Sequence, residues 1–203
     1  MKKALLNLSM VFLAGITFGQ KAAMQGLAIG DELWNRRDVQ LPVEAYEEIG
    51  AGAFAVKYRT GNGNAFHVTT SSERVVYMEN NWSGRKLDRR PLYTSFIFDL
   101  TTLDDIHKAL GSKGLLHKSI DGMEDNGYLH RVCSYEFANM KDVIISFVTK
   151  AALPDDGHLI IDPREFKLTA VIMTERIYQQ VIWGDITGTD PAYKKINSRA
   201  LGW

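Results

Sequence analysis

The first half of the chain contains two runs, 54–58 and 66–70, in which every second residue is apolar or β-branched. A period of two along the chain is typical of strands that bury one face. The segment between them, 60–64, is rich in glycine and asparagine, which favour tight turns. We therefore expect a hairpin here, followed by a third strand at 75–78.

The segment before this hairpin follows a different period. Leu41, Ala45 and Ile49 are spaced as on one side of a helix, with Pro42 in the first turn and Gly50 at the end. Proline is favoured at the start of a helix and glycine just past its end. This pattern predicts a short helix over 41–50.

The second half begins with a stronger helix signal at 101–111, where threonines precede two aspartates and a glycine closes the segment. Threonine caps, early acids and a terminal glycine all favour a helix. Alternating runs at 129–137 and 142–149 are joined by a short connection and predict an antiparallel hairpin. A further strand is expected at 166–174, and 190–196 has the composition of a helix start, with Asp190 as cap.

These elements define an α+β fold, mainly antiparallel sheet with two or three short helices. Because the order helix, strand, hairpin, strand occurs twice, two tandem αβββ units are one interpretation. A fold without any repeat is the other. We expect one domain over 20–203, either undivided or formed by two packed lobes at 20–92 and 93–203.

The amino terminus has the pattern of an export signal. Lys2 and Lys3 precede an apolar run, and small residues follow it. The run is shorter than the ~20 residues that span a bilayer, so a cleaved leader is favoured over a retained anchor. We predict a signal peptide at 1–19, with cuts at Ala22 or Ala23 as alternatives, and an extracytoplasmic protein, either periplasmic or secreted.

Charge and cysteine content exclude several classes of protein. The chain carries 24 basic and 24 acidic residues, and loss of the leader would leave 22 basic residues. It therefore lacks the positive field of a general nucleic-acid binder. Its single cysteine, Cys133, cannot form an internal disulfide and lies too far along the chain to receive a lipid at the leader. We expect Cys133 to be a small buried side chain of a strand.

One family resemblance follows from the second half. A Thr101-x-x-Asp104 helix that ends in Ala109-Leu110-Gly111 and leads into antiparallel strands resembles the exported αβββ proteins. These include small outer-membrane assembly lipoproteins and β-lactamase inhibitor proteins. The resemblance covers 101–174 and implies the architecture. It transfers no functional residue, because the lipid-attachment cysteine of the first group and the disulfides of the second are missing.

The sequence contains no recognised catalytic or metal-binding motif. Metal sites need ligands at fixed spacing, which the histidines at 67, 107, 117, 130 and 158 do not have. The acidic loop at 121–127 has Met123 where a calcium loop needs an oxygen ligand. Glycines at 61 and 63 lie in the expected hairpin and not between a strand and a helix, where phosphate is bound. No catalytic residue, metal or cofactor is predicted.

A basic segment joins the two halves of the chain and supplies the candidate binding residues. Arginine forks suit carboxylates, and aromatic rings provide anchoring area. The residues are Trp82, Arg85, Lys86, Arg89, Arg90 and Tyr93. The expected partner is an acidic protein or another anionic component of the cell envelope. The competing interpretation is a solvated connection with Trp82 tucked into the core.

These observations favour an exported, soluble, non-enzymatic binding or inhibitor-like domain. One alternative is a small extracytoplasmic hydrolase that uses His67, His130 or His158 as a base, in a site assembled from distant residues. A deep pocket that holds one of these histidines beside a carboxylate or hydroxyl would favour it over binding. Another alternative is a carrier of an apolar small molecule, with a cavity lined by phenylalanines. These are Phe54, Phe66, Phe96 and Phe98.

Overall fold

The computed structural model describes residues 23–35, 41–50, 52–117, 123–154 and 161–201. The predicted signal peptide at 1–19 and His158 lie outside the described residues. The described part is mainly antiparallel sheet with two α-helices, as the sequence predicted. The α+β fold class is thus confirmed.

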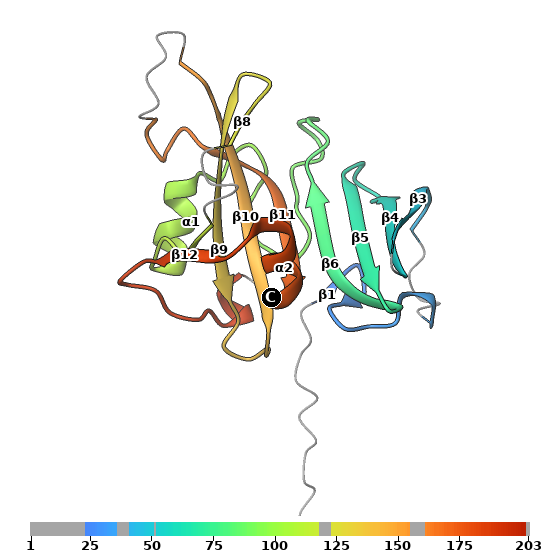
Figure 1. The fold of residues 1–203 in the computed structure, drawn as a ribbon. Coiled ribbons are helices and arrows are strands. Elements are labelled where there is room, and N and C mark those ends of the chain that lie inside the picture. The colour runs from blue at the N-terminus through green and yellow to red at the C-terminus, as the bar shows by residue number, and fades with distance from the viewer. Residues whose placement is uncertain (1–22, 36–40, 51, 118–122, 155–160, 202–203) are drawn as a thin grey trace, which may run out of the picture.

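Strands from both halves of the chain join in one large sheet (Figure 1). Its order is β12-β7-β9-β10-β11-β6-β5-β4-β3, with β8 beside β9, and β6 pairs with β11 to link the halves. The strands are β3 (Val43–Gly50), β4 (Ala53–Arg59), β5 (Ala65–Ser71), β6 (Arg74–Asn81), β7 (Leu115–His117), β8 (Glu124–Asp125), β9 (Tyr128–Glu136), β10 (Val143–Ala152), β11 (Lys167–Glu175) and β12 (Ile186–Thr189). β1 (Ala23–Met24) and β2 (Leu27–Ala28) form a separate small ribbon.

The two faces of this sheet differ in chemistry. Paired residues share a face, so one row can be followed from strand to strand. On one face a row is wholly apolar: Tyr135, Ile145, Met173, Met78, Val68, Val56 and Tyr46. The neighbouring row, on the other face, is mixed: Leu115, Ser134, Ser146, Ile172, Glu79, His67, Lys57 and Ala45. The core therefore lies against the first face, and polar groups gather on the second.

Helix α1 (Leu103–Leu110) covers the apolar face. Leu103 and Ile106 are buried in the main hydrophobic cluster, together with Tyr135 of β9. The helix is fixed to the sheet because the backbone N–H of Leu103 donates to Phe166 O at 2.9 Å. Gly111 ends it with φ of +72°, a left-handed conformation that glycine adopts at no steric cost. The predicted helix at 101–111 is confirmed.

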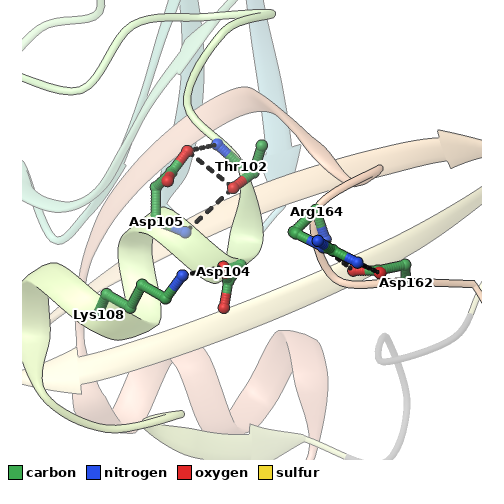
Figure 2. A network of polar contacts seen from close by, with 6 residues as sticks. All are labelled: Thr102, Asp104, Asp105, Lys108, Asp162 and Arg164. Carbon is green, nitrogen blue, oxygen red and sulfur yellow. Dashed lines mark hydrogen bonds and ion pairs between the residues drawn. The ribbon is translucent and has the colours of Figure 1, made fainter.

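The start of α1 is held by a reciprocal cap (Figure 2). Thr102 Oγ1 accepts from Asp105 N at 3.0 Å, and the Asp105 carboxylate accepts from Thr102 N at 2.9 Å. Thr102 Oγ1 also donates to the Asp105 carboxylate at 2.7 Å, and the two bonds that this carboxylate accepts, first from Thr102 N and then from Thr102 Oγ1, hold the pKa of Asp105 below its ordinary value. Asp104 pairs with Lys108 one turn later at 2.6 Å. In the nearby loop, bonds from Arg164 lower the pKa of Asp162 to about 2.

Replacing Thr102 with alanine should destabilise the protein by about 1 kcal/mol, the usual cost of a lost threonine cap. Urea unfolding at neutral pH measures this, and Thr102→Ser should restore most of it because it keeps the hydroxyl. Since the folded pKa of Asp105 is lowered, its contribution is present above the unfolded pKa and lost as pH falls through the folded pKa. The stability difference between Thr102→Ala and the parent should therefore shrink in acid. A constant difference would contradict this role for Asp105.

Helix α2 (Arg176–Trp183) lies on the polar face, where Figure 1 shows it in front of β10 and β11. Gln179 is 1% exposed and points at the sheet, and Tyr178 packs on Tyr77 of β6 with ring centroids 5.9 Å apart. The sequence did not predict this helix, because the usual helix signals are missing. The helix follows β11 without a turn, and its cap Glu175 makes no side-chain cap bond. Its apolar residues Ile177 and Val181 are exposed and do not mark a buried side.

The predicted helix over 41–50 is wrong, because this segment is strand β3. β3 pairs with β4, but its register shifts between Val43 and Ala45 and again between Glu48 and Gly50. An extra residue at each bulge breaks the alternation of period two and leaves a spacing that resembles a helix. The first half therefore has four strands in sequence, β3 to β6, and not an αβββ unit.

The predicted helix start at 190–196 is also wrong. Asp190 does cap, but it closes a turn: its carboxylate accepts from Ala192 N at 2.8 Å and from Lys113 N at 2.6 Å. The second bond ties this segment to the loop after α1. A short 3-10 helix, Ser198–Leu201, follows it, and another lies near the start of the described chain at Leu33–Asn35.

Candidate functional site

The predicted binding segment forms a compact loop after β6, which we call the basic loop (residues 82–93). Asn64, which is fully buried, organises it from the neighbouring turn: its Oδ1 accepts from Ser83 N at 2.9 Å, and its Nδ2 donates to Asp88 O at 2.7 Å. Asn62 Nδ2 donates to Arg90 O at 2.9 Å. These bonds fix the loop backbone against the β4–β5 hairpin.

Within the basic loop, further bonds close the chain on itself. Ser83 Oγ donates to Asp88 Oδ2 at 3.0 Å, and Asp88 N and Trp82 Nε1 both donate to Arg85 O, at 3.0 and 3.1 Å. Gly63 has a φ of +86°, a left-handed conformation that strains other residues, so the turn needs glycine there. Hydrogen bonds, and not a hydrophobic core within the loop, therefore hold the loop apex in one shape.

The apex presents three cations to solvent. Arg85, Lys86 and Arg90 are exposed, and no ion pair joins them to another described residue. Between them lies Leu87, which is 96% exposed. A rigid loop that holds an apolar side chain among unpaired cations can offer both contact area and charge to a partner.

The other three predicted residues support the loop. The Arg89 side chain is 24% exposed, and its Nη2 donates to Asp99 at 2.5 Å. Trp82 is partly buried against the core. Tyr93 is 4% exposed and meets Phe137 edge to face at 5.9 Å; burial raises its pKa to about 12.

Sequence reasoning missed Leu87 and the two asparagines that brace the loop. Asn62 and Asn64 were assigned to turn formation, which is correct for their backbone. Their side chains, however, bond residues more than twenty positions away. No local pattern signals such bonds, although a leucine flanked by cations in a polar segment could have marked Leu87 as an exposed apex.

A second polar cluster lies on the open part of the polar sheet face, over β5 and β6. His67 Nδ1 is 3.8 Å from Glu79 Oε2, and Tyr77 Oη donates to the same carboxylate at 2.9 Å. Burial and the Glu79 carboxylate raise the pKa of Tyr77. His67 Nε2 is buried and has no hydrogen-bond partner among the described residues.

A cavity of about 280 Å³ adjoins this cluster, with His67, Tyr77, Lys57 and Glu47 among its lining residues. His67 therefore borders this cavity beside the Glu79 carboxylate and the Tyr77 hydroxyl, but the cavity is half open to solvent and is not the deep pocket that would favour the hydrolase alternative. His130, another proposed base, lies on β9, where burial and then the nearby Lys150 charge lower its pKa.

The phenylalanines proposed for a carrier cavity do not line the cavities of about 260 to 300 Å³ found among the described residues. Phe66 and Phe98 are fully buried in the core, and Phe96 packs edge to face on Phe147 at 5.3 Å. Cys133 is 1% exposed on the apolar face of β9, which confirms its prediction as a small buried side chain.

Within the described ranges, no group of three or more histidine, cysteine, aspartate or glutamate side chains is placed to hold a metal ion. The same part of the chain has no helix with the length and apolar character needed to cross a membrane. Comparisons with protein-family models, with curated proteins and with solved structures found no match for this chain.

Proposed function

We propose that this protein is a non-enzymatic binding or inhibitor-like domain that works outside the cytoplasm and engages an anionic partner through the basic loop. The observation that carries the proposal is the braced apex with Arg85, Lys86 and Arg90 exposed around Leu87. An acidic protein or another anionic envelope component would pair with these cations and cover the leucine. The predicted leader supports a site of action in the envelope or the medium.

The test is affinity capture from native envelope and medium, followed by mass spectrometry. The triple variant Arg85→Ala, Lys86→Ala and Arg90→Ala should reduce capture of the partner about tenfold, because each exposed pair contributes roughly 0.2–1 kcal/mol. Arg89 is left intact, since its bond to Asp99 holds the loop. Raising the salt concentration should weaken capture by the parent more than by the variant.

A matched control removes the three exposed cations Lys141, Lys194 and Arg199, which lie away from the basic loop in sequence. This control should capture the partner as the parent does. Equal capture by parent and loop variant, with both folded, would overturn the proposal. Reproducible conversion of a small molecule that is lost on His67→Ala would instead support the alternative, a small hydrolase that uses the His67–Glu79 cluster.

A further inference from the structure

Strand β3 forms one end of the sheet. Among the residues that the structure describes, it pairs only with β4, which leaves its other edge free, and all eight of its residues are exposed. A free edge carries backbone N–H and C=O groups that can pair with another chain. Between its two bulges the segment Ala45–Glu48 keeps a regular register with β4, so a short stretch can accept a further strand.

Apolar side chains accompany this edge. Val43, Tyr46 and Ile49 are 59%, 53% and 47% exposed. Tyr46 stacks on Phe54 of β4 with centroids 5.3 Å apart, and Trp34, itself 53% exposed, meets Tyr46 edge to face at 5.8 Å. Rigid aromatic rings with open faces are typical anchors of protein interfaces. We call Trp34, Tyr46 and Phe54 the aromatic trio.

The charge of β3 indicates which occupant fits. It carries Glu44, Glu47 and Glu48 and no cation. Glu44 is already paired with Lys57 and Arg59, whereas no ion pair joins Glu47 or Glu48 to another described residue. A second copy of β3 would place glutamates against glutamates, which destabilises strand pairing. Lysines or arginines on an incoming strand would instead lie close to glutamate carboxylates of β3.

We propose that β3 is a docking edge for an extended basic segment of another protein, which adds as a strand beside Ala45–Glu48. Because successive side chains point to opposite faces, its alternate cations pair with Glu47 on one face, and its apolar side chains pack on the aromatic trio on the other face, which also carries Glu48. Main-chain bonds supply affinity and the alternate side chains supply selectivity, as in other cases of strand addition. This site is separate from the basic loop and takes a partner of opposite charge.

The probe is a fluorescent eight-residue peptide that alternates lysine and valine, titrated in anisotropy measurements against the full chain. The variant Glu47→Lys should weaken binding about fivefold, because attraction becomes repulsion at the exposed position that faces the peptide lysines. Glu124→Lys, on the exposed strand β8, is the matched control and should bind as the parent does. Tyr46→Ser should also weaken binding.

Two further peptides separate the contributions. The same peptide with alternate backbone nitrogens methylated cannot donate to the edge and should bind at least tenfold more weakly. A peptide that alternates glutamate and valine should bind more weakly than the lysine form. Equal binding of the lysine and glutamate peptides would overturn the proposal. So would equal binding by the parent and Glu47→Lys, or dimers of the parent that Tyr46→Ser dissolves.

Discussion

Replacing Phe147 with alanine should lower the free energy of unfolding by about 3 to 5 kcal/mol, the usual cost of removing a buried aromatic ring. Phe147 is fully buried on the apolar face of β10. Its ring meets Phe96 at 5.3 Å and Tyr135 at 6.2 Å, so the loop before α1 and the neighbouring strand would both face the resulting cavity. Urea unfolding followed by fluorescence measures the change.

Leu87→Ala is the control for this prediction. Leu87 is 96% exposed, so its truncation removes little contact and should change stability by less than about 0.5 kcal/mol. Since small domains are stable by only about 5–15 kcal/mol, the Phe147 change should shift the urea midpoint visibly. A loss below about 1 kcal/mol at Phe147 would mean that this part of the sheet is not close-packed.

The elements that sequence reasoning placed correctly are those whose signals are local. The hairpin of β9 and β10 shows its period of two because Cys133, Tyr135 and Phe137 all face the core. Helix α1 carries its caps within its own sequence. The prediction for the segment of β3 failed because its bulges conceal the alternation. Helix α2 was missed because the residue that it buries against the sheet is the polar Gln179.

The same limit applies to the candidate binding residues. Composition alone identified the basic loop as a run of cations between two aromatic residues. It could not separate the exposed Arg85 and Lys86 from Arg89, because the partner of Arg89, Asp99, belongs to the following segment. Nor could composition place Tyr93 in the core, since its neighbour Phe137 directly follows the distant strand β9. Contacts with residues distant in the sequence therefore decide which side chains of such a run stay exposed and unpaired.

Beneath α2, the sheet buries a small polar cluster. The Ser134 and Ser146 hydroxyls lie 2.7 Å apart, and Gln179 Nε2 donates to Ser146 Oγ at 3.1 Å. All three side chains are at most 1% exposed. Buried polar groups are tolerated when they bond to one another, so this cluster allows α2 to cover a polar face. A charge introduced there has no water to solvate it.

Gln179→Glu should therefore make stability depend on pH. Burial raises the pKa of the new carboxyl group in the folded state above its unfolded value of about 4.3. Above pH 4.3 the unfolded chain releases this proton first, so the variant loses about 1.4 kcal/mol per pH unit until pH reaches the folded pKa. Urea midpoints from pH 4 to 8 test this against Gln180→Glu, whose residue is exposed on the same helix. Parallel pH profiles for the two variants would show that water reaches the cluster and that α2 does not seal this face of the sheet.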